Sequence, residues 1–274
     1  MRAAVLGSPI AHSLSPVLHR AGYRELGITS WTYEAHEVRA PALAGFVAGL
    51  DEQWRGLSLT MPLKEVALEV ATEVDDVARR AGAANTLVRR ADGGWDATNT
   101  DVHGIVAALR PHLRDVPRRA LVVGAGATAR SSVLALAELG VQVLTVRARD
   151  TGRATDLLAW ALDLEIGIGS GSVAAIGPWV TTRDDVVVST VPAGASEDVA
   201  ATVPASHSGL LLDVVYAGWP TPLATAALGA GMVVVPGVDM LVEQAAEQFR
   251  LFTGRRPPVD VMRAAGVAAL GAGS

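Results

Sequence analysis

Near the middle of the chain stands Leu121-Val122-Val123-Gly124-Ala125-Gly126-Ala127-Thr128-Ala129-Arg130. The apolar run of residues 120–123 predicts a buried parallel strand, and residues 127–139 follow the pattern of a helix. A glycine turn between strand and helix is the context that the dinucleotide-binding fingerprint needs. Gly124 would make the tight turn, and Gly126 would let the backbone approach a pyrophosphate at the amino end of the helix. The stretch predicts a nucleotide site, with a purely structural turn as the alternative.

The regions on both sides of this stretch alternate between predicted strands and helices, which favours an α/β fold. Before the glycine turn, strands are expected at residues 3–6, 31–38, 55–59, 86–89 and 95–98. After it, strands are expected at residues 141–146, 186–189, 210–214 and 232–235. Residues 152–171 begin as a helix and become glycine-rich, so the end of that element is left undefined.

The composition limits the classes of function. The 274 residues suffice for two domains, and no apolar run is long enough to span a membrane. The formal net charge of −5, without a long basic run, argues against nucleic acid as the main partner. The chain has no cysteine, and its six histidines lack metal-ligand spacing, so disulfides, thiolate chemistry and a metal site are not expected. A cytoplasmic protein is expected.

Two serines precede the first long predicted helix. In GSPIAHSLSP, residues 7–16, Ser13 and Ser15 lie two apart just before a helix with Pro16 in its first turn. Hydroxyls and free amides at a helix start suit a carboxylate ligand. The alternative is that Ser15 only caps the helix and Ser13 is solvated.

A lysine follows the end of a predicted strand in GLSLTMPLK, residues 56–64. Short polar side chains there place donors at the carboxyl edge of a sheet, where ligands bind in open α/β folds. Lys64 is therefore a candidate proton donor to a carbonyl oxygen, with a solvated surface charge as the simpler interpretation.

Amide and carboxylate side chains also stand at the ends of two further elements. Asn85 lies in AANT, residues 83–86, and Asn99 and Asp101 lie in TNTD, residues 98–101. Asparagine is common in turns, and aspartate is a common helix cap. Taken singly, these residues indicate local structure at least as readily as ligand binding.

Taken in order, six stretches resemble the shikimate dehydrogenase family: SPIAHSLSPVLH, GLSLTMPLK, AANT, NTD, GAGATAR and GVDMLVEQAAEQF. The resemblance runs from Val5 to about Pro257. It implies an α/β substrate domain with a mixed sheet over residues 1–101 and a doubly wound, Rossmann-like NADP domain over residues 102–237. Closing helices over residues 238–274 would return to the first domain, and the site would lie in the cleft between the domains.

The resemblance also assigns roles to individual residues. It implies that Lys64 and Asp101 form the catalytic couple and that Ser13 and Ser15 bind the substrate carboxylate. The other substrate positions that it implies, besides Asp101, are Thr60, Asn85, Tyr216 and Gln244. The cofactor positions that it implies are Gly124, Ala125, Gly126, Ala127, Thr128, Ala129, Arg147, Val214, Gly237 and Met240.

Three positions depart from the family pattern. Ser58 replaces the usual asparagine, so one substrate contact would be lost or water-mediated, and Ala127 replaces a glycine. The usual Asn-Arg-Thr after the second nucleotide strand is matched to residues 146–148, Val-Arg-Ala. That strand lacks the acidic residue with which an NAD enzyme binds the ribose, so NADP is expected, with Arg147 on the 2′-phosphate and Arg149 adding charge. Asp150 would weaken this preference.

The implied reaction is reversible hydride transfer between NADPH and the 3-keto group of 3-dehydroshikimate, a step of aromatic amino-acid biosynthesis. Lys64 would be the acid for reduction, and Asp101 would orient it. The alternatives are a quinate dehydrogenase, a paralogue acting on an amino-substituted ring, and a nucleotide-binding regulator. Ser15, where quinate enzymes often have threonine, favours shikimate, and a regulator is expected to have lost Lys64 or Asp101. A monomer or homodimer that binds small molecules is expected.

Overall fold

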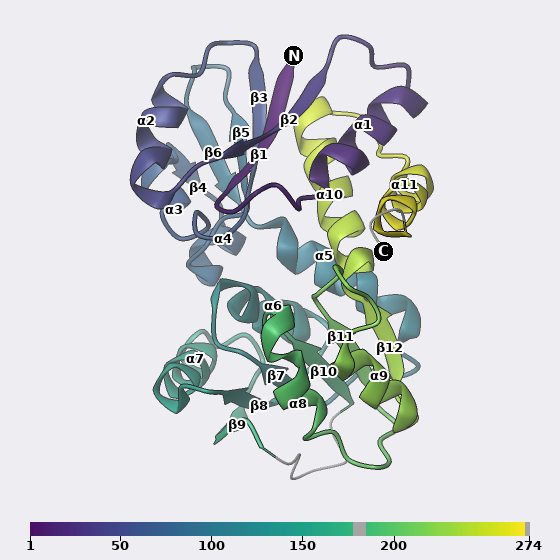
Figure 1. Ribbon diagram of the computed structural model, residues 1–274. Helices are drawn as coiled ribbons and strands as arrows, with labels where there is room; N and C mark the ends of the chain where they lie inside the picture. Colours follow the sequence, from purple (N-terminus) through teal and green to yellow (C-terminus); the bar gives the residue numbers. More distant parts are fainter. Residues whose placement is uncertain (178–184, 272–274) are drawn as a thin grey trace. The chain divides into compact units, whose positions relative to one another are not determined.

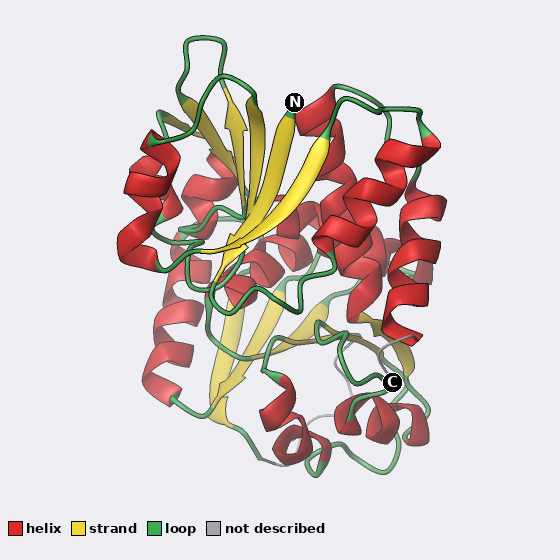
Figure 2. Ribbon diagram, turned by 45° about the horizontal axis from the view of Figure 1, so that its top comes forward, coloured by secondary structure: helices red, strands yellow, loops and turns green. Residues whose placement is uncertain are grey.

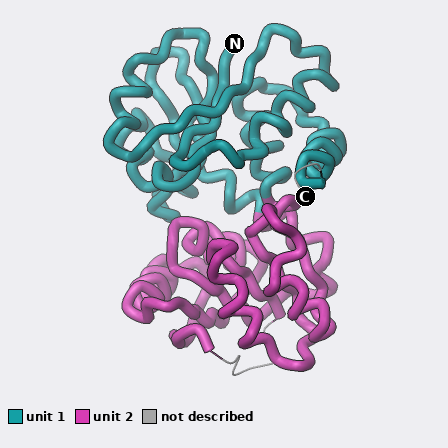
Figure 3. Tube along the Cα trace, in the orientation of Figure 1, with its two compact units in different colours: residues 1–104, 241–274 teal, residues 105–240 magenta. Residues whose placement is uncertain are grey.

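The computed structural model describes residues 1–177 and 185–271 and divides into two compact units (Figures 1 and 3). Unit 1 comprises Met1–Gly104 and Leu241–Ser274, and unit 2 comprises Ile105–Met240. The chain passes from unit 1 to unit 2 within helix α5 (Thr100–Leu109) and returns within helix α10 (Gly237–Thr253). Each unit is built around its own six-stranded sheet.

The sheet of unit 1 is mixed, as the expected fold class requires. Its strands are β1 (Arg2–Gly7), β2 (Thr32–Glu37), β3 (Trp54–Leu59), β4 (Glu73–Val74), β5 (Thr86–Arg89) and β6 (Trp95–Thr98), in the order β2-β1-β3-β5-β6-β4. Strands β1, β2 and β3 are parallel, whereas β5 runs antiparallel to both β3 and β6. The carboxyl end of β3 therefore lies beside the start of β5, which brings Ser58 opposite Thr86.

Helices flank this sheet (Figure 2). They are α1 (Ser15–Glu25), α2 (Leu43–Ala48), α3 (Ala67–Val70), α4 (Asp76–Ala81) and α11 (Val259–Gly271), with the unit 1 part of α10 and the 3-10 turn η1 (Ala40–Ala42). One hydrophobic core includes Leu57, Leu87 and Trp95. Gly56 lies so close to the Phe252 ring of α10 that a Cβ there would collide with it. This close approach sets α10 directly against β3.

An aromatic cluster fills the space between α1, β2 and α10. The His19 ring stacks on the Tyr33 ring with centroids 4.0 Å apart and also lies beside Phe249 and Phe252. Burial lowers the pKa of His19 to about 3, with a smaller opposing contribution from the nearby amide of Gln248. His19 is therefore neutral at physiological pH, and the cluster is an uncharged part of the core.

The sheet of unit 2 is fully parallel. Its strands are β7 (Arg119–Val123), β8 (Val143–Ala148), β9 (Ser170–Ala175), β10 (Val186–Ser189), β11 (Leu210–Asp213) and β12 (Val233–Pro236), in the order β12-β11-β10-β7-β8-β9. The first strand, β7, lies at the centre, and the chain winds outward from it in both directions. This is the doubly wound order of dinucleotide-binding folds, whose ligand site lies where the winding reverses, between β7 and β10.

The glycine turn connects β7 to helix α6 (Ala127–Glu138), as the sequence predicts. Gly124 has φ of 116°, which glycine adopts without strain, and a Cβ there would collide with Thr190 after β10. The other helices of unit 2 are α7 (Thr151–Asp163), α8 (Ser196–Ala200), α9 (Pro222–Gly229), the unit 2 part of α5, and the 3-10 turns η2 (Arg110–His112) and η3 (Ala193–Ala195). Among the described residues, no helix combines the length and apolar character needed to cross a membrane.

The region left undefined by the sequence, residues 152–171, ends in the edge strand β9. Its sequence SGSVAA is short of large apolar residues, and its side chains are exposed or half-buried. A Cβ on Gly171 would collide with the Leu144 carbonyl of β8 and with Leu158 of α7. This strand forms because it packs closely against residues that are distant in sequence. The pattern of apolar residues within the segment therefore does not predict it.

Candidate functional site

Lys64 and Asp101 form an ion pair in unit 1. Lys64 Nζ donates to Asp101 Oδ2 at 2.5 Å, and the side chains are 16% and 6% exposed. Lys64 follows the turn after β3, and its carbonyl accepts from the Ala84 N–H at 2.7 Å. Asp101 lies in the first turn of α5. Lys64 is thus paired and largely buried. The simpler interpretation of the sequence, a solvated surface lysine, is therefore wrong.

Lys64 is also the only lysine among the 23 lysine and arginine residues of the chain. An arginine holds its proton at all relevant pH values, whereas a lysine can release one. Among the lysine and arginine residues, the one side chain able to release a proton is thus held by a buried carboxylate. This compositional signal is visible in the sequence and strengthens the assignment of Lys64 as a proton carrier.

Asn85 holds the other oxygen of the same carboxylate. Its Nδ2 donates to Asp101 Oδ1 at 2.8 Å and faces Gln244 Oε1 at 3.3 Å. Its Oδ1 accepts from the Thr100 N–H at 2.8 Å. The structure therefore brings Lys64, Asn85, Asp101 and Gln244 together from four separate elements of unit 1.

Asn99 has a structural role, as the sequence favoured. Its Oδ1 accepts from the Asp101 N–H at 3.0 Å, and its Nδ2 donates to the Ala83 carbonyl at 2.8 Å. Asn99 thereby ties the start of α5 to the loop that carries Asn85. The Asp101 carboxylate takes no part in these two bonds. Its oxygens accept hydrogen bonds from Lys64 and Asn85.

The two serines lie at the start of α1, but Ser15 is not its cap. The helix begins at Ser15 with Leu14 in the N-cap position, and no side chain caps it, so the capping interpretation is wrong. Ser13 Oγ accepts from the Ser15 N–H at 3.3 Å. Thr60 lies at the end of β3, where its N–H donates to the Leu6 carbonyl at 2.9 Å. Neither serine is thus the N-cap residue of α1, although the Ser13 hydroxyl bonds the N–H of its first residue.

In unit 2, a cavity of about 230 Å³ lies at the carboxyl ends of β7, β8 and β10. It is lined by Gly124, Ala125, Gly126, Ala148, Arg149, Asp150, Arg153, Ile176, Thr190, Val191, Pro192 and Ala195. A Cβ on Gly126 would meet no atom within 4 Å, so this residue faces open space. The next residues, Ala127, Thr128 and Ala129, form the first turn of α6, with Ala129 buried against the sheet.

The arginines near this cavity are arranged differently from the sequence expectation. Arg147 lies inside β8, is 5% exposed and donates to the Gly177 carbonyl at 2.5 Å, and it does not line the cavity. Arg149, the first residue after β8, lines it together with Arg153. Arg153, which the sequence analysis missed, donates to the Ala125 carbonyl at 3.2 Å. Asp150 caps α7 by accepting from the Arg153 N–H.

The remaining expected residues lie at the carboxyl ends of β11 and β12. Val214 follows β11, and Gly237 begins α10 so close to it that a Cβ on Gly237 would collide with the Val214 backbone. Tyr216 is half-buried, and burial raises the pKa of its hydroxyl. Met240 is 7% exposed. Among the described residues, no group of three or more histidine or acidic side chains is placed to hold a metal ion.

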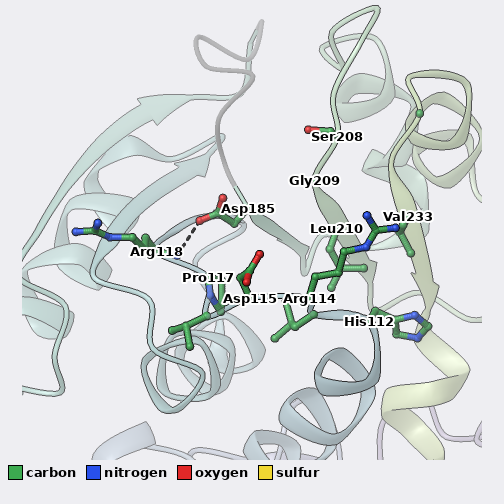
Figure 4. Close-up of a pocket in the computed structure, with 13 residues that line it drawn as sticks. His112, Arg114, Asp115, Pro117, Arg118, Asp185, Ser208, Gly209, Leu210 and Val233 are labelled. Carbon is green, nitrogen blue, oxygen red and sulfur yellow. Dashed lines mark hydrogen bonds between the residues drawn. The ribbon is translucent and has the colours of Figure 1, made fainter.

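A larger cavity of about 610 Å³ lies at the opposite edge of the unit 2 sheet (Figure 4). Its lining includes Asp185, which accepts from the backbone N–H groups of Arg118 and Arg119 at 2.7 and 3.0 Å. Arg118 points away from the pocket in the close-up. Because this cavity lies at the amino ends of the strands, it is not at the edge where open α/β sheets bind ligands.

Comparison with known proteins relates both units to one family. Residues 5–87 match the shikimate dehydrogenase substrate binding domain, and residues 237–265 match the shikimate 5'-dehydrogenase C-terminal domain. The chain is 37% identical over 272 residues to a shikimate dehydrogenase (NADP(+)) of Methanopyrus kandleri, with 95% of this chain and 93% of the relative covered.

Solved structures show the same relationship. The shikimate 5-dehydrogenase of Mycobacterium fortuitum is 45% identical with a TM-score of 0.83, covering 96% of this chain and 97% of its own. The shikimate 5-dehydrogenase of Thermus thermophilus, in complex with NADP(H) and shikimate, is 31% identical with a TM-score of 0.83. That likeness covers 98% of this chain and 100% of the Thermus chain.

Proposed function

Because this chain belongs to the shikimate dehydrogenase family, we propose that it catalyses the reversible, NADP-dependent reduction of 3-dehydroshikimate to shikimate. The observation that carries the proposal is the largely buried pair of Lys64 and Asp101, with Asn85 on the second carboxylate oxygen. As parts of the same proposal, the enzyme acts on small molecules in the cytoplasm as a monomer or homodimer.

Lys64 carries the proton in this mechanism. When bound, NADPH supplies the hydride that reaches the keto carbon. Lys64 gives a proton from Nζ to the carbonyl oxygen during reduction and takes it back during oxidation. Asp101 holds the ammonium in place through Oδ2, and Asn85 prevents the carboxylate from turning. The protein's contribution is a positioned proton and an oriented substrate.

Unit 1 is the substrate domain in this proposal. The hydroxyls of Ser13 and Ser15, at the start of α1, bind the substrate carboxylate, because a helix amino terminus favours an anion. Thr60, Asn85 and Gln244 bind the ring hydroxyls. Tyr216 is the remaining residue that the family resemblance assigns to substrate binding.

Unit 2 is the NADP domain. The glycine turn fits a dinucleotide, because Gly126 faces open space at the amino end of α6 and the adjoining cavity contains two arginines. We infer that Arg149 and Arg153 hold the 2′-phosphate, in place of Arg147. Their guanidinium groups suit a phosphate, and Asp150 is occupied as the cap of α7. Val214, Gly237 and Met240 would lie near the nicotinamide.

The choice of arginine is tested by two single variants. We expect Arg149→Ala to raise KM for NADP by about 10–100-fold, the value of a lost hydrogen bond to a charged group, and KM for NAD far less. Arg147→Ala should lower the unfolding temperature, because it removes a buried side chain, and change both KM values alike. Steady-state kinetics with each cofactor measure these effects. A selective loss of NADP binding in Arg147→Ala alone would restore the sequence-based assignment.

The proposed activity is tested with the purified wild-type protein by following absorbance at the nicotinamide band. Shikimate and quinate are each combined with NADP and with NAD. We expect shikimate with NADP to give the highest kcat/KM. A higher value for quinate would support the quinate dehydrogenase alternative, and no absorbance change in any combination would support a nucleotide-binding regulator.

A further inference from the structure

Behind the Lys64–Asp101 pair, unit 1 contains buried polar side chains that have no role in the proposed reaction. Gln248, Ser58 and Thr86 are 1%, 3% and 0% exposed, and Tyr33 is fully buried. Burying a polar group costs free energy unless the group finds a hydrogen-bond partner. Gln248 lies on α10 one turn after Gln244, facing β3 and β5.

These side chains form one continuous chain of hydrogen bonds. The Tyr33 hydroxyl donates to Ser58 Oγ at 2.6 Å, and Ser58 Oγ donates to Gln248 Oε1 at 2.7 Å. Gln248 Nε2 donates to Thr86 Oγ1 at 2.9 Å, and Thr86 Oγ1 donates to Asn85 Oδ1 at 2.7 Å. The last link is Asn85 Nδ2 to Asp101 Oδ1. The chain thus ends on the carboxylate that holds Lys64.

Backbone partners determine the direction of this chain. Gln248 Nε2 also donates to the Asn85 carbonyl at 3.2 Å, and a carbonyl can only accept, so the Gln248 amide has one orientation. The Thr100 N–H donates to Asn85 Oδ1, which orients the Asn85 amide in the same way. Every bond therefore donates toward Asp101, an order in which hydrogen bonds strengthen one another.

The far end of the chain is anchored in the aromatic cluster. The Tyr33 ring stacks on His19 between α1 and α10, and burial raises the pKa of the Tyr33 hydroxyl, which keeps its proton. The shorter Ser58, where the family pattern has asparagine, is not left without a partner, because Tyr33 and Gln248 contact its hydroxyl on either side. The chain therefore links a rigid core to the catalytic pair.

We propose that Gln248 is a positioning residue, which orients Asn85 and Asp101, and through them Lys64, by way of the hydrogen-bonded chain from Tyr33 to Asp101. Without the Gln248 amide, Thr86 and Ser58 lose their shared partner, and the Asn85 backbone carbonyl loses its Gln248 donor. The Asp101 carboxylate then turns more freely and holds Lys64 less firmly. The expected kinetic effects rest on the proposed function. The orientation of Asn85, Asp101 and Lys64 by Gln248 does not depend on it.

The geometric content is tested by amine labelling, which needs no activity. Because Lys64 is the only lysine, reductive methylation modifies only Lys64 and the Met1 amine, and the latter is an internal reference. We expect Gln248→Met to raise the Lys64 rate relative to Met1 several-fold, and Tyr33→Phe to raise it less. Tyr23→Phe is the matched control, since among the described residues the buried Tyr23 hydroxyl has no hydrogen-bond partner. Equal labelling in all four proteins would overturn the proposal.

Kinetics separate positioning from simple loss of folding. We expect Gln248→Met to lower kcat by about 10–100-fold, as misplaced catalytic groups do, with KM for NADP unchanged and a larger solvent deuterium isotope effect on kcat. Tyr33→Phe, which keeps the ring, should show a smaller change in the same direction, and Tyr23→Phe none. A lower kcat with an unchanged isotope effect, matched by loss of folded protein, contradicts the proposal. If the wild-type protein were inactive but Lys64 were still labelled faster in Gln248→Met, the proposed function would be rejected and the positioning role of Gln248 would stand.

Discussion

Replacing Lys64 with alanine is expected to lower kcat by about 10²–10⁴-fold, the usual contribution of a positioned acid or base. The Lys64 ammonium is largely buried and bonded to Asp101, so the variant removes the proposed proton carrier and not a surface charge. KM for shikimate should change much less, because the proposed substrate-binding residues, the two serines and Gln244, are unchanged. Steady-state kinetics of the purified variant give both values.

Lys64→Arg is the matched control for charge. An arginine keeps the positive charge beside Asp101 but does not release its proton, so kcat should remain low. Titration with NADP, followed by fluorescence, should give wild-type affinity for both variants, because the cofactor residues are untouched. A kcat within a few-fold of wild type in Lys64→Ala would exclude Lys64 as the proton carrier.

The double variant Ser13→Ala with Ser15→Ala is expected to weaken shikimate binding strongly while leaving NADP binding unchanged. Losing two hydrogen bonds to a charged carboxylate costs roughly 3–6 kcal/mol before water replaces them. The change also removes the bond from the Ser15 N–H to Ser13 Oγ and the contact of Ser15 with the Tyr33 hydroxyl, so the unfolding temperature is measured alongside. Calorimetric titration with shikimate and with NADP measures the two affinities separately.

A second pair of serines provides the control. Ser170 and Ser172 are also two residues apart, and both are exposed on the edge strand β9. Replacing both with alanine should leave shikimate affinity at the wild-type value. If the Ser13 and Ser15 variant also retained that affinity, the substrate carboxylate would have to bind elsewhere.

The strand, glycine turn and helix around Gly124 could be predicted because their physical causes are local. An apolar run forms a buried strand, and a glycine permits the positive φ of the turn. The polar residues Lys64, Asn85 and Asp101 were recognisable as candidates for a related reason. They stand at the ends of predicted elements, and such ends gather at one edge of a sheet.

The arginine proposed to bind phosphate shows how the position of a strand end changes an assignment. The sequence placed the end of the second nucleotide strand at residue 146, whereas β8 continues to Ala148. Arg147 is therefore part of the strand and buried, and Arg149 is the first side chain beyond it. Strand ends depend on pairing with neighbours, here β7 and β9, which periodicity within one segment does not report.

By itself, the sequence determined the α/β class and the glycine turn and singled out Lys64 as a candidate proton carrier, since each depends on short-range pattern or on side-chain chemistry. The single lysine among 23 basic residues belongs to this kind of information. Only the tertiary structure decided which side chains meet. Gln248 contacts Ser58 across 190 residues of chain, and it does so because α10 packs directly on β3 beside Gly56. A contact of that kind follows from packing between distant segments, for which no pattern within either segment is sufficient.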